Sequence, residues 1–375
     1  MGAITAGELT SELERGIGAD GSALAERIRL RVGDEALANG SGQFVDELDV
    51  AWAIVAPGAQ AAPAVVATLG AEFRLPMRAL GDAGMYVATA RWEHGSAVRW
   101  QYEVDGARVG GGQTETYLIH PDARERPEVP KGRLVKREPW RSRVFAGTIR
   151  DWSVYFPAQT EGAAAVMVFQ DGRRFYEDFV PTVFDNLIAE GAMPPTVGIF
   201  LNPGVFADTT VSNRSFEYDT LSDQYARFLL EEILPEVGRE RELRQDAAGR
   251  AICGMSSGGI CSFTVAWQRP DQFQKVLSHI GSFTNIASGP TLRDGGHNYP
   301  FLIRKMPPKP IRVALQDGEN DLNHAAGNWW LANLQMVDAL RFAGYDHTFT
   351  AGKGFHSIGH GRAIFPDSMR WIWRE

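Results

Sequence analysis

Two adjacent serines, Ser256 and Ser257, lie among glycines in the run Gly254-Met-Ser-Ser-Gly-Gly259. A serine hydroxyl held at a sharp strand-to-helix turn can act as a nucleophile, and glycines two residues before and after it leave room for that turn. Ser256 has this frame, whereas Met255 stands two residues before Ser257. The spacing therefore predicts a nucleophile elbow in which Ser256 is the reactive residue.

Gly254 and Gly259 fit part of a phosphate-binding loop, in which Lys and then Ser or Thr follow the second glycine. Ile260 and Cys261 occupy those positions here, so the charge that would neutralise a phosphate is missing and we set this interpretation aside. A plain turn is the other alternative. The apolar segment before the motif and the helix-forming segment after it favour the elbow.

A serine nucleophile needs a base to remove its proton and a carboxylate to orient that base. Three carboxylates lie in one predicted loop after the apolar run 311–315, namely Asp317, Glu319 and Asp321. Further along the chain His356 lies in a glycine-rich segment, with His360 as an alternate base. The order serine, acid, histidine is the one found with nucleophile elbows. The two histidines also have H-x-x-x-H spacing, but the glycines predict a loop, so we expect no metal site.

Negative charge that develops on a carbonyl oxygen during attack requires backbone donors, which form an oxyanion hole. The N–H of Ser257, directly after the nucleophile, is the first expected donor. The second is expected in the loop after an earlier strand, where Gly172 and Arg173 follow the apolar run 163–170. We therefore assign the oxyanion hole to Ser257 and to either Gly172 or Arg173.

Alternating strand and helix patterns after residue 150 must position these groups. Continuous apolar runs, typical of strands buried on both faces, occur at 163–170, 197–201, 251–253, 276–280 and 311–315. Helical spacing of apolar residues occurs at 183–190, 223–237, 329–342 and 363–373. This alternation predicts an α/β fold with a mostly parallel sheet flanked by helices.

The chain before residue 150 has a different pattern. Period-two alternation between turn residues predicts antiparallel strands of a small β-sandwich at 49–55, 64–69, 85–92 and 98–104. Residues 1–45 are left unassigned, and 24–32 fit either a helix or a strand. We expect an N-terminal domain at 1–116, a linker rich in proline and charge at 117–143, and a catalytic domain at 144–375.

Composition narrows the classes of function. The formal net charge of the 375-residue chain is −8, which argues against a general nucleic-acid binder because such domains usually carry a basic face. The two cysteines, Cys253 and Cys261, are expected to be small core residues, as in a reducing compartment. No run approaches 18 apolar residues, so no membrane span is expected. No signal peptide is visible, which predicts a cytoplasmic protein unless a signal has been removed.

Five segments resemble the enterochelin-esterase-like group of the α/β-hydrolase superfamily, which includes esterase D and carbohydrate esterase 1 relatives such as feruloyl and acetyl-xylan esterases. They are MVFQDG (167–172), NRSFEYDTLSDQYARFLLEEILP (213–235), CGMSSGG (253–259), LQDGENDLNHAAGNWWLANLQMVDALRFAGYD (315–346) and GFHSIGHGRAIFPDSMRWIW (354–373). The resemblance implies an α/β-hydrolase fold preceded by an immunoglobulin-like (E-set) β-sandwich. The acid of this family stands in a Gly-x-x-Asp turn, which favours Asp321 and leaves Asp317 and Glu319 as alternatives.

The resemblance also implies a serine esterase that hydrolyses a small-molecule ester through an acyl-enzyme, without a cofactor. The substrate would be a carbohydrate or feruloyl-type ester, or a siderophore ester, and its expected contacts are Arg214, Phe216, Tyr218 and Trp329. The alternative is a non-catalytic carbohydrate-binding or scaffold protein with a degenerate hydrolase domain. A homodimer is one option for the assembly.

Overall fold

The computed structural model describes residues 2–16, 21–69, 71–81, 84–159, 161–177, 179–286 and 294–375. It contains two compact units, which we describe separately. The first comprises Met1–Ile119 with Lys353–Phe355, and the second His120–Gly352 with His356–Glu375. In the described parts of the chain, no helix is both long enough and apolar enough to cross a membrane.

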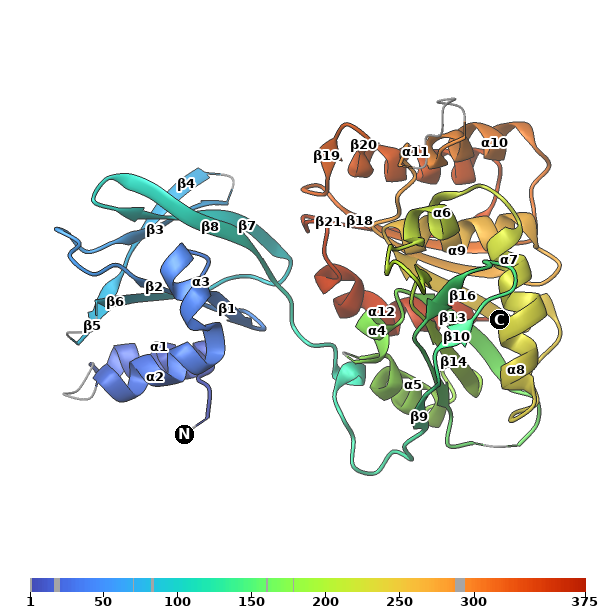
Figure 1. Cartoon of the computed structure of the whole chain (residues 1–375), viewed down its shortest axis with the longest axis horizontal. Helices are drawn as coiled ribbons and strands as arrows, with labels where there is room; N and C mark the ends of the chain where they lie inside the picture. The colour runs from blue at the N-terminus through green and yellow to red at the C-terminus, as the bar shows by residue number, and fades with distance from the viewer. Residues whose placement is uncertain are drawn as a thin grey trace. The chain divides into compact units, whose positions relative to one another are not determined.

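The first unit is a β-sandwich of two antiparallel four-stranded sheets (Figure 1). One sheet has the order β1 (Gln43–Asp46), β2 (Asp49–Val55), β6 (Met85–Arg91), β5 (Arg78–Leu80). The other has the order β4 (Ala71–Pro76), β3 (Ala64–Leu69), β7 (Ser96–Val104), β8 (Ala107–Thr116). Trp52 of β2 and Trp100 of β7 meet edge to face with ring centroids 6.3 Å apart. The four strands predicted from period-two alternation are confirmed.

Three helices cover the outer face of the first sheet: α1 (Ala6–Arg15), α2 (Gly21–Val32) and α3 (Asp34–Asn39). Their apolar side chains, including Leu9, Ile28 and Leu37, are buried in one cluster with residues of β2 and β6. Thr5 and Glu8 cap the start of α1 reciprocally, since each side chain bonds the backbone N–H of the other residue. The segment 24–32, which fits either a helix or a strand by pattern, is therefore helical.

The second unit is built on an eight-stranded sheet. Its order is β21 (Asp346–Gly352), β18 (Arg312–Gly318), β17 (Lys275–His279), β16 (Arg250–Met255), β13 (Ala165–Gln170), β14 (Thr196–Leu201), β12 (Trp152–Phe156), β9 (Arg133–Lys136). The strands from β21 to β14 are parallel, whereas β12 and β9 pair antiparallel. Every residue of β13, β14 and β16 is buried, which explains their continuous apolar sequences.

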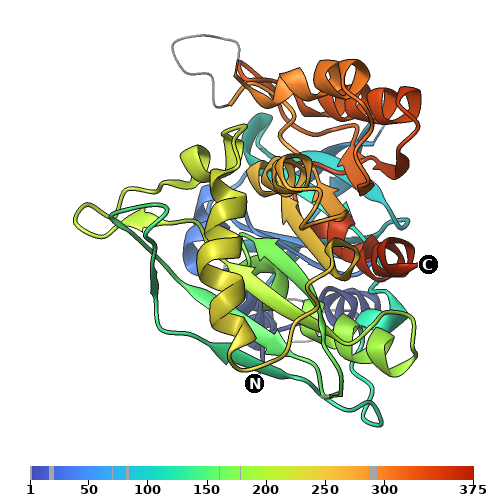
Figure 2. The same ribbon diagram turned by 90° about the vertical axis from the view of Figure 1, so that its right-hand side faces the viewer.

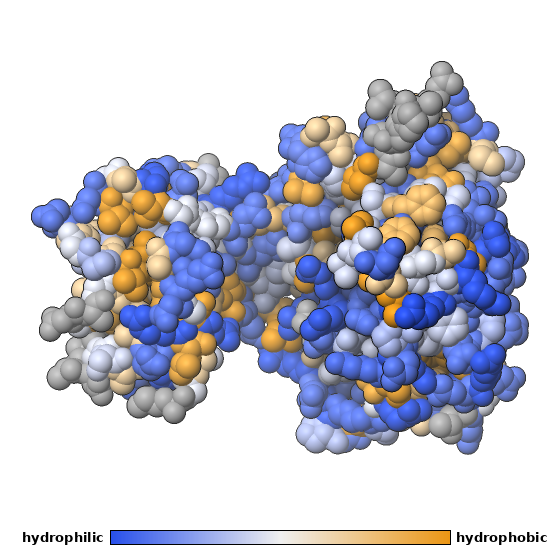
Figure 3. All heavy atoms as spheres, in the orientation of Figure 1, coloured by the Kyte–Doolittle hydropathy of each residue, from blue (hydrophilic) through white to orange (hydrophobic). Residues whose placement is uncertain are grey.

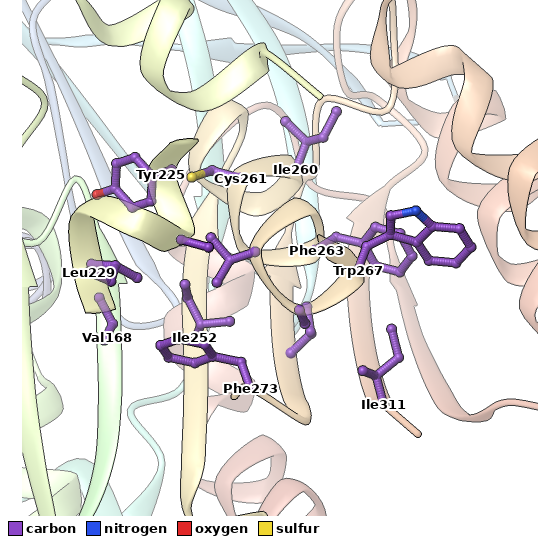
Figure 4. Close-up of a cluster of buried hydrophobic side chains, with 14 of the residues drawn as sticks. Val168, Tyr225, Leu229, Ile252, Ile260, Cys261, Phe263, Trp267, Phe273 and Ile311 are labelled. Carbon is purple, nitrogen blue, oxygen red and sulfur yellow. The ribbon is translucent and has the colours of Figure 1, made fainter. Parts of the chain in front are cut away.

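Helices cover both faces of this sheet (Figure 2). One face packs against α7 (Gln224–Phe228), η2 (Leu229–Ile233), α8 (Leu234–Gly238), α9 (Ser257–Gln268), α10 (Tyr299–Lys305) and α11 (Trp329–Phe342). The other packs against α4 (Arg173–Tyr176), α5 (Val180–Ala189) and α12 (Gly359–Trp373). Figure 4 shows how Phe263 and Trp267 of α9 lie over the strands in the first of these cores. The α/β fold with a mostly parallel sheet flanked by helices, predicted from the alternating pattern, is confirmed.

Shorter elements complete the second unit. They are η1 (Pro121–Ala123), β10 (Trp140–Arg141), β11 (Thr148–Arg150), β15 (Val205–Phe206), α6 (Arg214–Asp219), η3 (Ala247–Gly249), η4 (Gly296–Asn298), β19 (Asn323–His324) and β20 (Gly327–Asn328). Hydrophilic residues cover most of the face of this unit seen in Figure 3, where apolar residues form separate small patches.

Four local features differ from the sequence predictions. The segment 117–143, predicted as a linker, contributes β9 and β10, and β9 pairs with β12 at the edge of the sheet. The helix predicted at 223–237 contains a π-helical turn, η2. β18 continues to Gly318, so Asp317 lies in a strand rather than a loop. α12 begins at Gly359, so His360 is helical.

Candidate active site

Ser256 occupies the turn between β16 and α9, as the glycine frame predicts. Its backbone angles are φ 58° and ψ −124°. Residues with a Cβ rarely adopt this conformation, which is strained by about 1–3 kcal/mol. Its N–H donates to the carbonyl of His279 at 3.0 Å, and its carbonyl accepts from Ser282 N–H at 3.0 Å. The strained turn is thus held by backbone bonds to the segment after β17, and Ser256 stays partly exposed.

The glycines of the motif are needed because the strand and the helix approach closely. A Cβ on Gly254 would lie 2.4 Å from the carbonyl carbon and oxygen of Gly258, and one on Gly259 would lie 2.5 Å from Ser278 Oγ. A Cβ on Gly258 would lie 3.0 Å from Gln170 Cβ. The first contact is the most severe because backbone cannot move aside as a side chain can.

We expect Gly254→Ala to destabilise the protein by about 1–3 kcal/mol or more, since overpacking a buried turn forces backbone shifts. Chemical denaturation measures this change. Gly238→Ala is the matched control, because a Cβ there meets nothing within 4 Å and alanine favours the helix by about 0.5–1 kcal/mol. Equal stability of the two variants would contradict the steric explanation of the motif.

His356 joins the serine to a carboxylate. Its Nε2 lies 2.8 Å from Ser256 Oγ, and its Nδ1 lies 2.5 Å from Asp321 Oδ1. A carboxylate only accepts hydrogen bonds, so Nδ1 carries the ring proton and Nε2 is left to accept from the serine hydroxyl. The imidazole is 20% exposed and the Asp321 side chain is fully buried. The three side chains that the sequence selected are therefore in one hydrogen-bonded chain.

The other two carboxylates of the predicted acid loop lie elsewhere. Glu319 is exposed. Asp317 is fully buried at the end of β18, where it accepts from Gly318 N–H at 2.8 Å and from Asn333 Nδ2 at 2.9 Å. Burial, with the carboxylate of Asp321 nearby, raises the pKa of Asp317 well above its ordinary value. Asp321 is thus the acid that faces His356.

His360, the alternate base, belongs to a separate buried chain. Its Nδ1 lies 3.1 Å from Gln316 Nε2, and Gln316 Oε1 lies 3.2 Å from His279 Nδ1. Burial lowers the pKa of His279 to about 4, so this ring is neutral at physiological pH. The chain ties α12, β18 and β17 together beneath the site, and it explains why His356 rather than His360 faces the serine.

The backbone N–H groups expected to form the oxyanion hole differ in whether they are already hydrogen-bonded. Ser257 opens α9, and the first N–H groups of a helix have no carbonyl partner within it. Gly172 N–H instead donates to Leu201 O at 3.1 Å, so the assignment of Gly172 is wrong because β14 already uses that donor. Arg173 N–H makes a longer contact of 3.3 Å with Asn202 Oδ1, while its side chain is exposed and paired with Glu177.

The sequence did not reveal that α6 positions the segments that carry the expected oxyanion donors. Arg214 forms a bidentate ion pair with Asp171, with its nearest contact at 2.6 Å. Tyr218 OH accepts the Asp171 N–H at 3.3 Å. The side chain of Ser257 hydrogen-bonds to Asp219, a buried carboxyl whose pKa is raised by desolvation. α6 therefore holds both the loop after β13 and the start of α9.

Two of the predicted substrate contacts are core residues instead. Tyr218 is completely buried, and burial raises its pKa well above the usual range. Trp329 is 1% exposed, donates from Nε1 to Ser282 Oγ at 3.1 Å, and lies edge to face with His356, ring centroids 5.8 Å apart. It supports the imidazole and presents no surface to a ligand. Phe216, in contrast, is 54% exposed, and Arg214 is half-buried.

A profile of the family described as "Putative esterase" matches residues 146–370. This match covers more than half of the chain and includes the elbow, the acid and the histidine. The chain belongs to this esterase family.

Individual relatives of this chain are distant in sequence. An iron(III) enterobactin esterase of Dickeya dadantii (strain 3937) is 24% identical over 248 residues, which are 62% of this chain and 53% of the relative. The match thus spans about half the length of that curated relative. An enterochelin esterase from Shigella flexneri has the same fold, with a TM-score of 0.64 and 15% identity over 90% of this chain and 96% of that chain. A ferulic acid esterase structure covers 65% of this chain and 98% of its own, with 18% identity and a TM-score of 0.52.

In the part of the chain that the structure describes, no group of three or more His, Cys, Asp or Glu side chains is arranged to hold a metal ion. Both cysteines are free and buried, and burial raises their thiol pKa well above the usual range. They pack as small core residues beside the elbow, as predicted.

Proposed function

We propose that the protein is a serine esterase that hydrolyses carboxylic esters through an acyl-enzyme. The observation that carries this proposal is the continuous chain from Ser256 Oγ through His356 to Asp321, with contacts of 2.8 and 2.5 Å. This arrangement is the one that lets a neutral imidazole accept a serine proton while a carboxylate stabilises the resulting cation. A degenerate, non-catalytic domain would have no need to keep Ser256 in a strained backbone conformation.

Acylation begins when Ser256 Oγ forms a bond to the ester carbonyl carbon and gives its proton to His356 Nε2. The carbonyl oxygen becomes an oxyanion, for which we propose the N–H groups of Ser257 and Arg173 as donors. His356 then protonates the leaving alcohol oxygen, and the carbon–oxygen bond breaks. A water molecule repeats the sequence on the acyl-enzyme, with His356 again the base, and releases the acid product.

For the substrate we propose an ester with an aromatic acyl group. Phe216 is a large apolar side chain exposed on α6, the helix that is tied to the loop after β13. The charge of Arg214, on the same helix, is paired with Asp171, so this arginine has little net charge left for a multiply anionic ligand. These features favour a feruloyl-type ester over a siderophore ester. The cytoplasmic location and the homodimer stay predictions.

A substrate panel tests this proposal. We expect hydrolysis of p-nitrophenyl acetate and butyrate, and a higher kcat/KM for methyl ferulate than for an acetylated sugar or a catecholate trilactone. Phe216→Ala should raise KM for the feruloyl ester more than for the acetate. A preference for the trilactone would contradict the aromatic-acyl proposal, whereas no turnover of any ester by folded protein would contradict the esterase proposal.

A further inference from the structure

Two buried carboxyl groups lie side by side behind His356. Asp317 is the next-to-last residue of β18, and Asp321 follows in the turn closed by the bond from Asp321 N–H to Gly318 O at 3.0 Å. Both residues are buried, with exposed fractions of 0% and 8%. The two carboxyl groups are within hydrogen-bonding reach of each other. Only Asp321 contacts His356, so the proposed mechanism leaves Asp317 without a role.

Each oxygen of Asp317 already has a fixed donor. Oδ1 accepts from Gly318 N–H at 2.8 Å, and Oδ2 accepts from Asn333 Nδ2 at 2.9 Å. Asn333 Nδ2 is itself held by the carbonyls of Gly281 and Trp329 at 3.0 and 3.1 Å. The carboxyl of Asp317 is therefore anchored to both β18 and α11, and its orientation is set by its surroundings.

The two oxygens of Asp321 are unequal. Oδ1 accepts from Leu322 N–H and from His356 Nδ1, both at 2.5 Å. Oδ2 is buried and receives no N–H or hydroxyl group in the described part of the chain. A buried carboxylate oxygen without a donor is strongly unfavourable. Its neighbour Asp317 becomes the missing donor once that carboxyl holds a proton.

We propose that Asp317 is a positioning residue: as a neutral carboxylic acid it donates its O–H to Asp321 Oδ2 and so aims Oδ1 at His356. This role rests on the proposed esterase function, because it acts through the base of that reaction. Two adjacent carboxylates away from water repel each other, so one of them keeps its proton. The bond to His356 favours the charged form of Asp321, which leaves the proton on Asp317.

Among the residues that the structure describes, Asp321 is the charged side chain that acts on Asp317. Asn333, which faces Asp317 from α11, is neutral. The residue that pairs with Asp317 on the neighbouring strand β21 is Ala351. The histidines nearest along the strands, His279 of β17 and His360 of α12, bond to Gln316. Adjacent strand residues point to opposite faces, so those rings lie on the other side of the sheet. Asp321, with His356 behind it, is the titratable group that Asp317 meets.

The sign of the pH effect follows from the raised pKa of Asp317. The folded protein holds a proton that the unfolded chain releases near the ordinary carboxyl pKa, so the free energy of unfolding falls as pH rises from that value to the raised pKa of the folded state. Above that range Asp317 ionises, its O–H bond to Asp321 is lost, and a second negative charge stands beside the acid. Catalytic activity should therefore have an alkaline limb that is controlled by Asp317.

The test compares Asp317→Ala, Asp317→Asn and Glu319→Gln in the full chain, with rates of p-nitrophenyl butyrate hydrolysis corrected for the background of Ser256→Ala. Removal of the donor in Asp317→Ala should lower kcat about 10–100-fold with little change in KM, the effect expected of a misaligned base. Asp317→Asn keeps an N–H donor, so we expect kcat within about fivefold of the wild type at pH 7. In Asp317→Asn, the alkaline limb of the pH–kcat profile should disappear or move up by at least about one pH unit. Glu319→Gln, an exposed carboxylate two residues away, should leave both kcat and the limb in place.

Three results would overturn the inference: equal losses in Asp317→Ala and Asp317→Asn, no loss in Asp317→Ala, or an unchanged alkaline limb in Asp317→Asn. If neither variant folds, the infrared spectrum of the wild type at pH 7 decides, because a neutral buried carboxylic acid has its own C=O band and its absence contradicts the proposal. Wild-type protein that hydrolyses no ester and takes up no fluorophosphonate contradicts the proposed function itself. An active wild type that fails these variant tests contradicts only the role of Asp317.

Discussion

Ser256→Ala is expected to lower the rate of ester hydrolysis by about 10⁴–10⁶ and to abolish covalent labelling by a fluorophosphonate, because removal of the nucleophile disables the whole catalytic chain. The change removes one oxygen whose strong contact is His356 Nε2 at 2.8 Å. The backbone bonds that hold the turn do not involve that oxygen. The variant should therefore fold normally, and mass spectrometry of the labelled protein with stopped assays of a p-nitrophenyl ester measures both effects.

Ser257→Ala is the matched control, since it changes the same atom type one residue later. Its backbone N–H, the proposed oxyanion donor, is kept, and only the side-chain bond to Asp219 is lost. We expect labelling to persist, with a loss of stability of about 1–2 kcal/mol from the weakened bond to a buried carboxyl. Labelling that survives Ser256→Ala or vanishes in Ser257→Ala would show that the glycine frame selects the wrong serine.

Asp321→Asn should reduce kcat by about 10⁴ while KM changes little, the effect that the same change has on the acid of a serine–histidine–acid triad. An amide donates as well as accepts, so the imidazole turns to the tautomer in which Nε2 carries the proton and cannot take one from Ser256. Steady-state kinetics at pH 8 measure this loss. The change is isosteric, and the Asp321 side chain is fully buried, so misfolding should be checked by circular dichroism.

The same substitution at the other carboxylates of the segment supplies the comparison. Asp317→Asn and Glu319→Gln each remove one acid within four residues of Asp321, but neither of these contacts His356. At pH 7 we expect Asp317→Asn to stay within about fivefold of the wild-type kcat and Glu319→Gln to keep the wild-type kcat. A loss of about 10⁴ at Asp317, with little at Asp321, would mean that the acid has been assigned to the wrong member of the pair.

Much of the fold follows from local pattern. Strands such as 165–170 and 196–201 are buried on both faces, so nearly every residue in them is apolar and they can be recognised without any partner. The helix at 329–342 was predicted with its observed bounds. Its helical spacing of apolar residues begins after Asn328, which caps the helix, and ends before a turn that contains glycine. The elbow could also be recognised from the sequence. A Cβ at position 254 would lie 2.4 Å from the backbone of Gly258, so this turn requires glycine there and the glycine spacing marks it.

Other features could not be predicted, because the local sequence does not show how deeply their residues are buried. β9 lies at the edge of the sheet, and two of its three exposed residues are charged, so this short strand cannot be told from a linker by its sequence. β21 is the opposite edge strand and is only partly buried, which leaves it without an apolar run. Tyr218 and Trp329 are aromatic residues near polar motifs, and no local signal separates a ligand contact from a core position.

The sequence by itself determined the fold class, and it singled out Ser256 and the order serine, acid, histidine as the predicted site, because each depends on the spacing of neighbouring residues. Tertiary structure decided which carboxylate meets His356, which backbone N–H groups are already bonded, and which aromatic side chains are buried. Those outcomes depend on distances between segments far apart in the chain. Asp317 and Asp321 are alike as sequence, yet one faces the imidazole and the other lies behind it, because β18 ends between them.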